Sequence, residues 1–339
     1  LNDGSFRSWD APPLDVSPDE GYARELAAAA AASGVDYAFS PDSKELAYVR
    51  NPDKVEAVST NSDIYILPLS GGMAKNITLR NRGYDVGPIY TRDGKYIIYR
   101  SQATAGFEAD RWRLMSYSRA TGVATEITKK FDLQVDEVVL SPDGNYAYFI
   151  ASERGRVPIY RVPLGGAEPQ KMVPNVSAAN LQIAPDGKSL VFAHSTNALP
   201  AEIYRADINE GTVTPLTTAN KNFMAQFGLR NAEDVEWIGA VGKKNHGFIV
   251  KPSNFDAGKK YPLLVLIHGG PQGAWSDNWG YRWNPQVFAN NGYVVFCPNP
   301  RGSTGYGQQF VNEISGDWGG KAYVDIMNGT ADVLRRNSF

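Results

Sequence analysis

Two glycine-rich segments, each placed directly after an apolar run, are the parts of the sequence best suited to chemistry. The run Leu263–Ile267 leads into His268-Gly269-Gly270-Pro271, and the run Tyr293–Cys297 leads into a stretch from Pro298 to Gly307. Glycine lets a backbone N–H approach a bound molecule because no Cβ stands in the way. N–H groups held in place stabilise the negative charge that grows on a carbonyl oxygen during acyl transfer, and one such donor contributes about 2.7–4 kcal/mol.

The elements around these segments are typical of an α/β sheet. Both apolar runs are continuous, as in strands buried on two faces, and a helical stretch near Asn284–Asn291 separates them. A strand, a helix and a strand with no hairpin turn predict a parallel pair. Two further strands are expected at Val235–Ile238 and His246–Val250, and a last helix at Gly320–Arg336. Residues at helical spacing predict that last helix, namely Tyr323, Met327, Thr330, Ala331 and Leu334.

A repeated hairpin dominates the first two thirds of the chain. Its turn is Pro-Asp-Gly or a close variant, and the shared aspartates are Asp42, Asp93, Asp143 and Asp186. Proline presets one φ angle, the aspartate bonds back to the backbone, and glycine accepts a positive φ. Each copy continues with a second strand, a glycine-containing turn and a short last strand. The copies follow each other at intervals of 43 to 51 residues.

Repeats of about 40–50 residues built from short strands are typical of the blades of a β-propeller. We therefore expect about four blades in residues 1–233 and an α/β domain in residues 234–339. The alternative is a β-sandwich with similar hairpins, which four copies in the same order disfavour. A helix is expected near residues 18–33, where Ser17 and Glu20 form a capping box ahead of an alanine-rich run.

Composition excludes several classes of function. A net charge of −2 over 339 residues gives no field that would recruit nucleic acid or an anionic membrane. No apolar run is long enough for a membrane span. The single cysteine, Cys297, lies in an apolar strand and is interpreted as a core residue. His194 and His246 lack ligand-spaced partners, so we expect neither a metal site nor a cofactor.

Several motifs resemble the prolyl oligopeptidase family of serine peptidases. Propeller-type repeats precede Leu266-Ile267-His268-Gly269-Gly270-Pro271 and Asn299-Pro300-Arg301-Gly302-Ser303-Thr304-Gly305-Tyr306-Gly307. Three further stretches are similar to the branch of dipeptidyl-peptidase five and the acylaminoacyl-peptidases. These are Gln272-Gly273-Ala274-Trp275, Arg282–Phe288 and Gly316–Gly320. The resemblance covers essentially the whole chain.

The resemblance implies an all-β propeller of about four blades followed by the N-terminal part of an α/β-hydrolase fold. It implies a peptidase that releases dipeptides from the N-termini of oligopeptides through an acyl-enzyme, with the N–H groups of Gly270 and Gly269 as the oxyanion hole. An acylaminoacyl-peptidase or an oligopeptidase on the same fold, and a non-catalytic propeller that binds proteins, are the alternatives. Family members of this branch are often secreted or periplasmic, and a homodimer is compatible with the resemblance.

The sequence departs from the family pattern at one point. The nucleophile motif Gly-x-Ser-x-Gly does not occur in it. In the family this motif follows the helix that ends near Arg335, so the resemblance places the serine, aspartate and histidine of the triad beyond Phe339. We therefore expect the chain to be a fragment that is inactive alone and that needs the C-terminal part of the hydrolase domain as its partner.

Three residues near the glycine-rich turns have more than one interpretation. His268 is expected to orient the turn rather than to act as the base, because the base of this fold follows the nucleophile. Ser303 lacks the flanks of a nucleophile elbow and is expected to pack near the site. Arg301 is expected to form a structural ion pair rather than to clamp a substrate.

A peptidase that removes dipeptides must bind a free α-ammonium group. A carboxylate that projects from the propeller would do so through charge-assisted hydrogen bonds. Glu108 and Asp110 are the candidates, because they lie in an inter-strand loop that is rich in aromatic and acidic residues. The alternative is a local ion pair of these carboxylates with Arg111 or Arg113.

Overall fold

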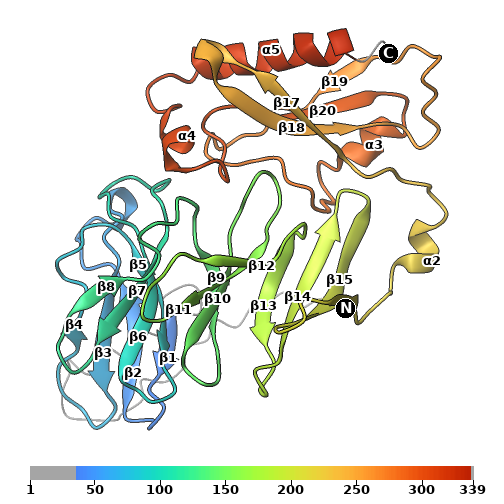
Figure 1. Ribbon diagram of the computed structural model, residues 1–339. Coiled ribbons are helices and arrows are strands. Elements are labelled where there is room, and N and C mark those ends of the chain that lie inside the picture. Colours follow the sequence, from blue (N-terminus) through green and yellow to red (C-terminus); the bar gives the residue numbers. More distant parts are fainter. Residues whose placement is uncertain (1–35, 337–339) are drawn as a thin grey trace, which may run out of the picture. The chain divides into compact units, whose positions relative to one another are not determined.

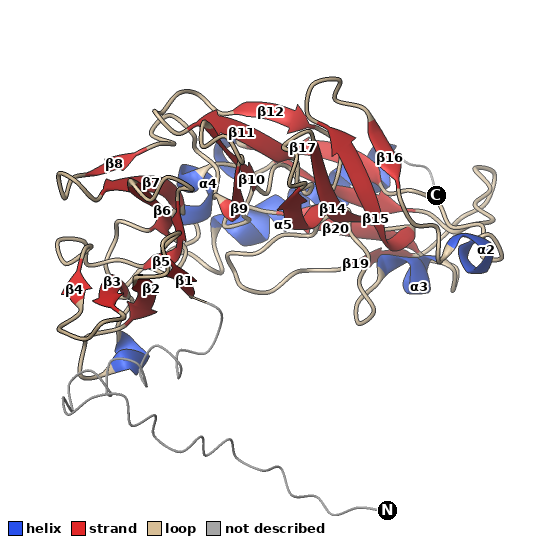
Figure 2. Ribbon diagram, turned by 90° about the horizontal axis from the view of Figure 1, so that it is seen from below, coloured by secondary structure: helices blue, strands red, loops and turns tan. Residues whose placement is uncertain are grey.

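The computed structural model describes residues 36–336, and the helix expected near residues 18–33 lies outside the described residues. The described chain packs as two compact units (Figure 1). The first consists of residues 36–108 and 115–125, and the second of residues 109–114 and 126–336. Strands make up most of the regular structure in both units (Figure 2).

The first unit contains two four-stranded sheets with their strands in chain order. One sheet, antiparallel throughout, consists of β1 (Tyr37–Phe39), β2 (Glu45–Arg50), β3 (Asp63–Pro68) and β4 (Lys75–Asn76). The other consists of β5 (Asp85–Tyr90), β6 (Tyr96–Ser101), β7 (Arg113–Ser118) and β8 (Ala124–Glu126), although Arg113, Leu114 and Glu126 are grouped with the second unit. A 3-10 turn, η1 (Glu56–Val58), lies between β2 and β3. The first strands of the two sheets, β1 and β5, lie against each other over a shared apolar core.

Two more antiparallel sheets of the same kind open the second unit. They consist of β9 (Asp136–Leu140), β10 (Tyr146–Ile150), β11 (Ile159–Pro163) and β12 (Gln170–Val173), and of β13 (Ala178–Ile183), β14 (Ser189–Thr196), β15 (Leu199–Asp207) and β16 (Val213–Pro215). Here too the first strands, β9 and β13, lie against each other, and Ile159, Leu190 and Phe192 belong to one core. Four such sheets confirm the predicted blades.

The predicted hairpin turn has the same chemistry in all four sheets. Each shared aspartate accepts a hydrogen bond at 3.0–3.2 Å from the backbone N–H two residues later, which belongs to Lys44, Lys95, Asn145 and Lys188. Three turns continue with glycine at positive φ, and Ser43 adopts a φ of 57° in the first. In the second turn, hydrogen bonds from the Lys95 backbone and the Thr91 hydroxyl lower the pKa of Asp93 to about 2.

The second unit continues into a mixed sheet with the strand order β17-β18-β20-β19. The strands are β17 (Glu233–Ile238), β18 (Lys244–Val250), β19 (Leu263–Val265) and β20 (Val294–Asn299). β19 and β20 pair in parallel, as predicted, and the other two pairs are antiparallel. The connections carry α2 (Lys221–Met224), η2 (Ala240–Gly242), α3 (Pro285–Ala289) and α4 (Gln308–Asn312), and α5 (Lys321–Arg336) ends the described chain.

Helix α5 covers one face of this sheet, and α3 contacts the other (Figure 1). At Gly329 a Cβ would lie 2.6 Å from the Trp237 ring, so glycine allows the close approach of helix and sheet. The buried positions of α5 are Ala322, Asp325, Gly329 and Val333. Tyr323, Met327 and Leu334, whose spacing predicted the helix, lie instead on its exposed side. Cys297 is buried, as expected, and burial raises the pKa of its thiol.

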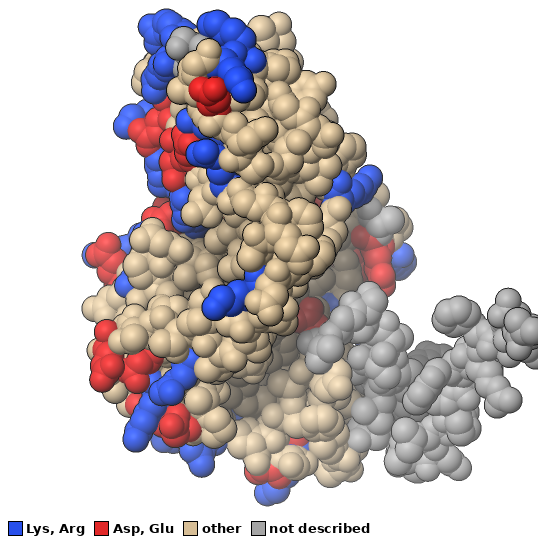
Figure 3. Space-filling view, turned by 90° about the vertical axis from the view of Figure 1, so that its right-hand side faces the viewer, with Lys and Arg blue, Asp and Glu red and all other residues tan. Residues whose placement is uncertain are grey.

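Charged side chains of both signs are interspersed on the face shown in Figure 3, around a broad uncharged area. Among the described residues, none of the helices has the length and apolar character that crossing a membrane requires. No group of three or more His, Cys, Asp or Glu side chains within residues 36–336 is placed to hold a metal ion.

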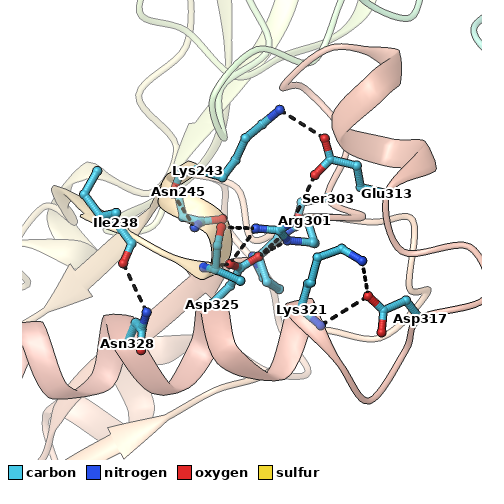
Figure 4. Close-up of polar contacts among 12 residues, drawn as sticks. Ile238, Lys243, Asn245, Arg301, Ser303, Glu313, Asp317, Lys321, Asp325 and Asn328 are labelled. Carbon is cyan, nitrogen blue, oxygen red and sulfur yellow. Dashed lines mark hydrogen bonds and ion pairs between the residues drawn. The ribbon is translucent and has the colours of Figure 1, made fainter.

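A buried ion-pair cluster ties α5 to the turn after β20 (Figure 4). Arg301 donates from Nε to Asp325 Oδ2 at 2.7 Å and from Nη1 to Glu313 Oε2 at 3.1 Å. The side chains of Arg301 and Asp325 are 1% and 0% exposed. Asp325 also accepts from the backbone N–H groups of Arg301 and Ala240. The structural ion pair expected for Arg301 is therefore present.

Asp325→Asn should destabilise the second unit, because it leaves the buried Arg301 guanidinium with a weaker partner. Breaking one side of a buried pair costs about 3–5 kcal/mol, and urea unfolding measures the loss. Asp317→Asn is the matched control on the partly exposed Asp317–Lys321 pair, where less than about 1 kcal/mol is expected. Equal losses in the two variants would contradict the role given to Asp325.

A second buried carboxyl group lies at the start of β5 in the first unit. Asp85 is fully buried, and its Oδ2 accepts a hydrogen bond from Asn81 Nδ2 at 3.0 Å. Within the described residues its Oδ1 has no hydrogen-bond partner. Burial, together with the negative charge of Asp63, raises the pKa of Asp85 to about 7.

Asp85→Asn should remove the loss of folding free energy that ionisation of Asp85 causes as pH rises. The pKa of Asp85 is about 7 in the folded protein and 3.8 in the unfolded chain. The wild-type free energy of unfolding therefore falls as pH rises between these two values. Relative to wild type, the variant should gain about 2–3 kcal/mol in urea unfolding between about pH 5 and about pH 8. Asp93→Asn is the control, because Asp93 stays ionised over that range. The same pH dependence for both variants would overturn the assignment.

Candidate active site

The loop between β19 and α3 contains the two glycines singled out by the sequence. Gly269 and Gly270 are exposed, and within the described residues neither N–H donates a hydrogen bond. Gly270 has a φ of 135°, and a Cβ there would lie 2.7 Å from the Gln272 nitrogen, so this position requires glycine. The Cβ position of Gly269 faces open space. Two exposed N–H groups without acceptors in one turn can bind an anionic oxygen.

The His268 ring lies between this turn and the turn after β20. Its Nδ1 is 2.9 Å from the Gly269 carbonyl oxygen, and its Nε2 is 2.9 Å from Ser303 Oγ. Ser303 is fully buried, and its hydroxyl donates to the Pro300 carbonyl oxygen at 2.6 Å. Burial lowers the pKa of His268, which favours the neutral ring. The ring is thus engaged on both sides by the protein, as expected for a residue that orients the turn.

Asn299, at the end of β20, fixes the middle of the same loop. Its Oδ1 accepts from the Trp275 N–H at 2.7 Å, and its Nδ2 donates to the Trp275 carbonyl oxygen at 2.9 Å. The Thr304 N–H donates to the Gly273 carbonyl oxygen at 3.0 Å. Sequence reasoning did not assign these roles. The available signal was a single amide side chain at the end of an otherwise apolar strand.

Asp277 attaches the loop to the propeller-type sheets of the second unit. Its N–H donates to the Gly155 carbonyl oxygen at 2.7 Å, and its Oδ1 accepts from the Asn197 N–H at 2.8 Å. The Ser177 hydroxyl donates to its carbonyl oxygen. The loop is therefore held from two sides, by β20 with the turn after it and by the preceding sheets.

The other two histidines have separate partners. His246 is 1% exposed, with Nε2 2.8 Å from Asp234 Oδ1 and Nδ1 2.7 Å from the Tyr306 hydroxyl. His194 Nδ1 accepts the Ser177 N–H at 3.0 Å. Both rings are structural, as expected. Asp234 also binds Arg156 through two hydrogen bonds of 2.8 Å, a contact that sequence reasoning missed.

Glu108 and Asp110 lie in the loop between β6 and β7. Glu108 is exposed, and its carboxylate makes no hydrogen bond or ion pair within the part of the chain that the structure describes. Asp110 Oδ1 accepts the Arg111 N–H at 2.9 Å. Arg111 and Arg113 form ion pairs with Glu126, at 3.1 and 3.8 Å.

Comparisons with known proteins agree on one family. A sequence model of the prolyl oligopeptidase family matches residues 279–339. The chain is 36% identical to dipeptidyl-peptidase 5 of Porphyromonas endodontalis over 310 residues, which are 90% of this chain and 44% of that protein. It is 34% identical to a probable dipeptidyl-peptidase 5 of Arthroderma benhamiae, covering 86% of this chain and 42% of that protein.

Solved structures give the same fold. The chain superimposes on Pyrococcus horikoshii acylaminoacyl peptidase with a TM-score of 0.73 and 21% identity, over 89% of this chain and 45% of that one. Porphyromonas gingivalis dipeptidyl peptidase 4 gives a TM-score of 0.61 and 19% identity, over 82% and 39%. The chain spans less than half the length of the curated relatives it matches. With its repeated four-stranded sheets and its glycine turn, it belongs to the prolyl oligopeptidase family.

Proposed function

We propose that this chain is part of a serine peptidase that releases dipeptides from the N-termini of oligopeptides through an acyl-enzyme. The observation that carries the proposal is the exposed Gly269-Gly270 turn, whose N–H groups have no acceptor within the described residues. The names of the relatives with 34–36% identity support the substrate class. We assign residues 1–233 to the propeller and 234–339 to the first part of an α/β-hydrolase domain, a boundary that lies at the start of β17.

In this proposal the Gly270 N–H, with that of Gly269, binds the oxygen that becomes negative when a serine attacks the scissile carbonyl. Preorganised backbone donors stabilise that charge without having to reorient during the reaction. The chain contains no Gly-x-Ser-x-Gly motif, so the attacking serine and its acid and base come from another part of the whole protein. The isolated chain is then inactive, and the rest of the hydrolase domain is its partner.

A free α-ammonium group needs a carboxylate that is not already neutralised. Glu108 meets this condition, because it is exposed and has no ion pair within the described residues. Asp110 follows Ala109, whose carbonyl oxygen accepts from Gln308 Nε2 of α4 at 3.0 Å. The Glu126 carboxylate is a less suitable anchor than Glu108, because Glu126 already forms ion pairs with Arg111 and Arg113.

An acylaminoacyl-peptidase is the second candidate, because the fold is also that of Pyrococcus horikoshii acylaminoacyl peptidase. The two activities differ at one point, since the first requires a charged N-terminus and the second a blocked one. A non-catalytic propeller that binds proteins has no need for an exposed pair of backbone donors. For both peptidase candidates, the dipeptidyl-peptidase and the acylaminoacyl-peptidase, the proposed substrates are oligopeptides.

Gly270→Ala in the full-length protein should lower kcat by about 10²–10³-fold with little change in KM, because it displaces an oxyanion donor. The matched control is Gly211→Ala in the β15–β16 turn. Gly211 also has a positive φ, 69°, and open space at its Cβ position. Both variants should lose some stability from backbone strain, but only Gly270→Ala should lose kcat. Equal kcat for the two variants would refute the oxyanion assignment.

Glu108→Gln, and separately Asp110→Asn, test the α-ammonium site. Loss of a charged hydrogen bond worth about 1.5–3 kcal/mol should raise KM for unblocked peptides by about 10–100-fold and leave acetylated peptides unchanged. Quantifying the products by mass spectrometry at several substrate concentrations gives KM for the unblocked and for the acetylated peptide. Glu126→Gln is the control, because this carboxylate is paired with Arg111. If wild type prefers acetylated peptides, the acylaminoacyl-peptidase proposal replaces the dipeptidyl one.

A further inference from the structure

We propose that Ser303 is a positioning residue that acts through the His268 ring to fix the direction of the Gly270 N–H. The inference rests on the proposed function of that N–H as the oxyanion donor. It concerns three groups in series, the Ser303 hydroxyl, the His268 ring and the peptide unit that joins Gly269 to Gly270. The contacts between them are both 2.9 Å long.

The planar peptide unit connects the two ends of this series. The Gly269 carbonyl and the Gly270 N–H belong to the same plane and point in opposite directions. The hydrogen bond between His268 Nδ1 and the Gly269 oxygen therefore also sets where the Gly270 N–H points. Restraint is needed because glycine on both sides lets the unit rotate at little steric cost.

The proton positions follow from what each atom can do. A carbonyl oxygen only accepts, so Nδ1 of His268 must carry the hydrogen that bonds to Gly269. Burial favours the neutral ring, which leaves Nε2 with a lone pair that needs a donor. The Ser303 hydroxyl is the donor within reach. The hydroxyl also donates to the Pro300 carbonyl oxygen at 2.6 Å, so its one proton is shared between Nε2 and that oxygen in a three-centre hydrogen bond.

The position of Ser303 is itself fixed. Its side chain is fully buried in the turn that Arg301 anchors to Asp325. The next residue, Thr304, bonds through its N–H to Gly273 in the loop that carries the glycines. The same burial excludes a different role, since a serine with 0% exposure beside a histidine has no access to a substrate and is not a nucleophile.

Nitrogen-15 NMR of the histidine rings tests the hydrogen-bond series without any activity measurement. The chain has three histidines, and His268→Gln identifies the signals of this one. In wild type at neutral pH we expect Nδ1 to be protonated and Nε2 to be an unprotonated acceptor. Ser303→Ala should move the Nε2 signal to that of a free acceptor and populate the other tautomer. Ser189→Ala, which removes another buried hydroxyl of the second unit, one that accepts from Arg205 Nε, should leave the His268 signals unchanged.

A wild-type ring that is protonated at Nε2 alone would overturn the inference, and so would His268 signals that ignore Ser303→Ala. The wild-type measurement decides even if the variant fails to fold. In the full-length protein, Ser303→Ala should lower kcat by about 10–100-fold and change KM by less than about threefold. An active wild type whose kcat is unaffected by Ser303→Ala refutes the positioning role alone. A wild type with the expected ring signals but no peptidase activity refutes the proposed function alone.

Discussion

One peptide unit, between Gly269 and Gly270, has to present its N–H to the outside while its carbonyl is held from within. A backbone donor without an acceptor is tolerated here because the turn is exposed. The hydrogen bonds around it restrain the turn and leave the Gly270 N–H itself without an acceptor: His268 contacts the Gly269 oxygen, and Thr304 contacts the Gly273 oxygen. Behind them the Arg301–Asp325 pair holds the turn after β20 against α5. Contacts thus lead without a break from the Arg301–Asp325 pair through Ser303 and His268 to the Gly269–Gly270 turn.

The parts of the fold that the sequence predicted are those whose chemistry is local. The hairpin turns could be recognised because an aspartate, two residues from the N–H it accepts, needs no distant partner. The parallel pair β19–β20 could be recognised because each strand lies in a continuous apolar run; β20 is fully buried, whereas β19 is half-buried. The glycine turn was found for the same reason, since Gly270 is required by its own backbone angle and by the Gln272 nitrogen next to it.

The parts that sequence reasoning missed depend on tertiary partners. Asp325 occupies the buried face of α5 only because Arg301, far away in the chain, pairs with it there. The apolar residues Tyr323 and Met327 gave the correct helix but lie on its exposed side, since Gly329 and Asp325 determine which face meets the sheet. The same holds for Glu126, whose ion pairs with Arg111 and Arg113 could not be read from the spacing of those residues.

In the proposed reaction of the complete protein, the Gly270 N–H stabilises the negative charge of the tetrahedral intermediate. The most direct measurement is the amide NMR signal of Gly270 in the full-length protein, before and after a peptidyl boronic acid forms its tetrahedral adduct. We predict that the Gly270 proton moves strongly downfield in the adduct, as expected when a backbone N–H donates to an oxyanion, while a distant glycine such as Gly211 does not move. A fully inhibited protein in which the Gly270 signal is unchanged would contradict the account.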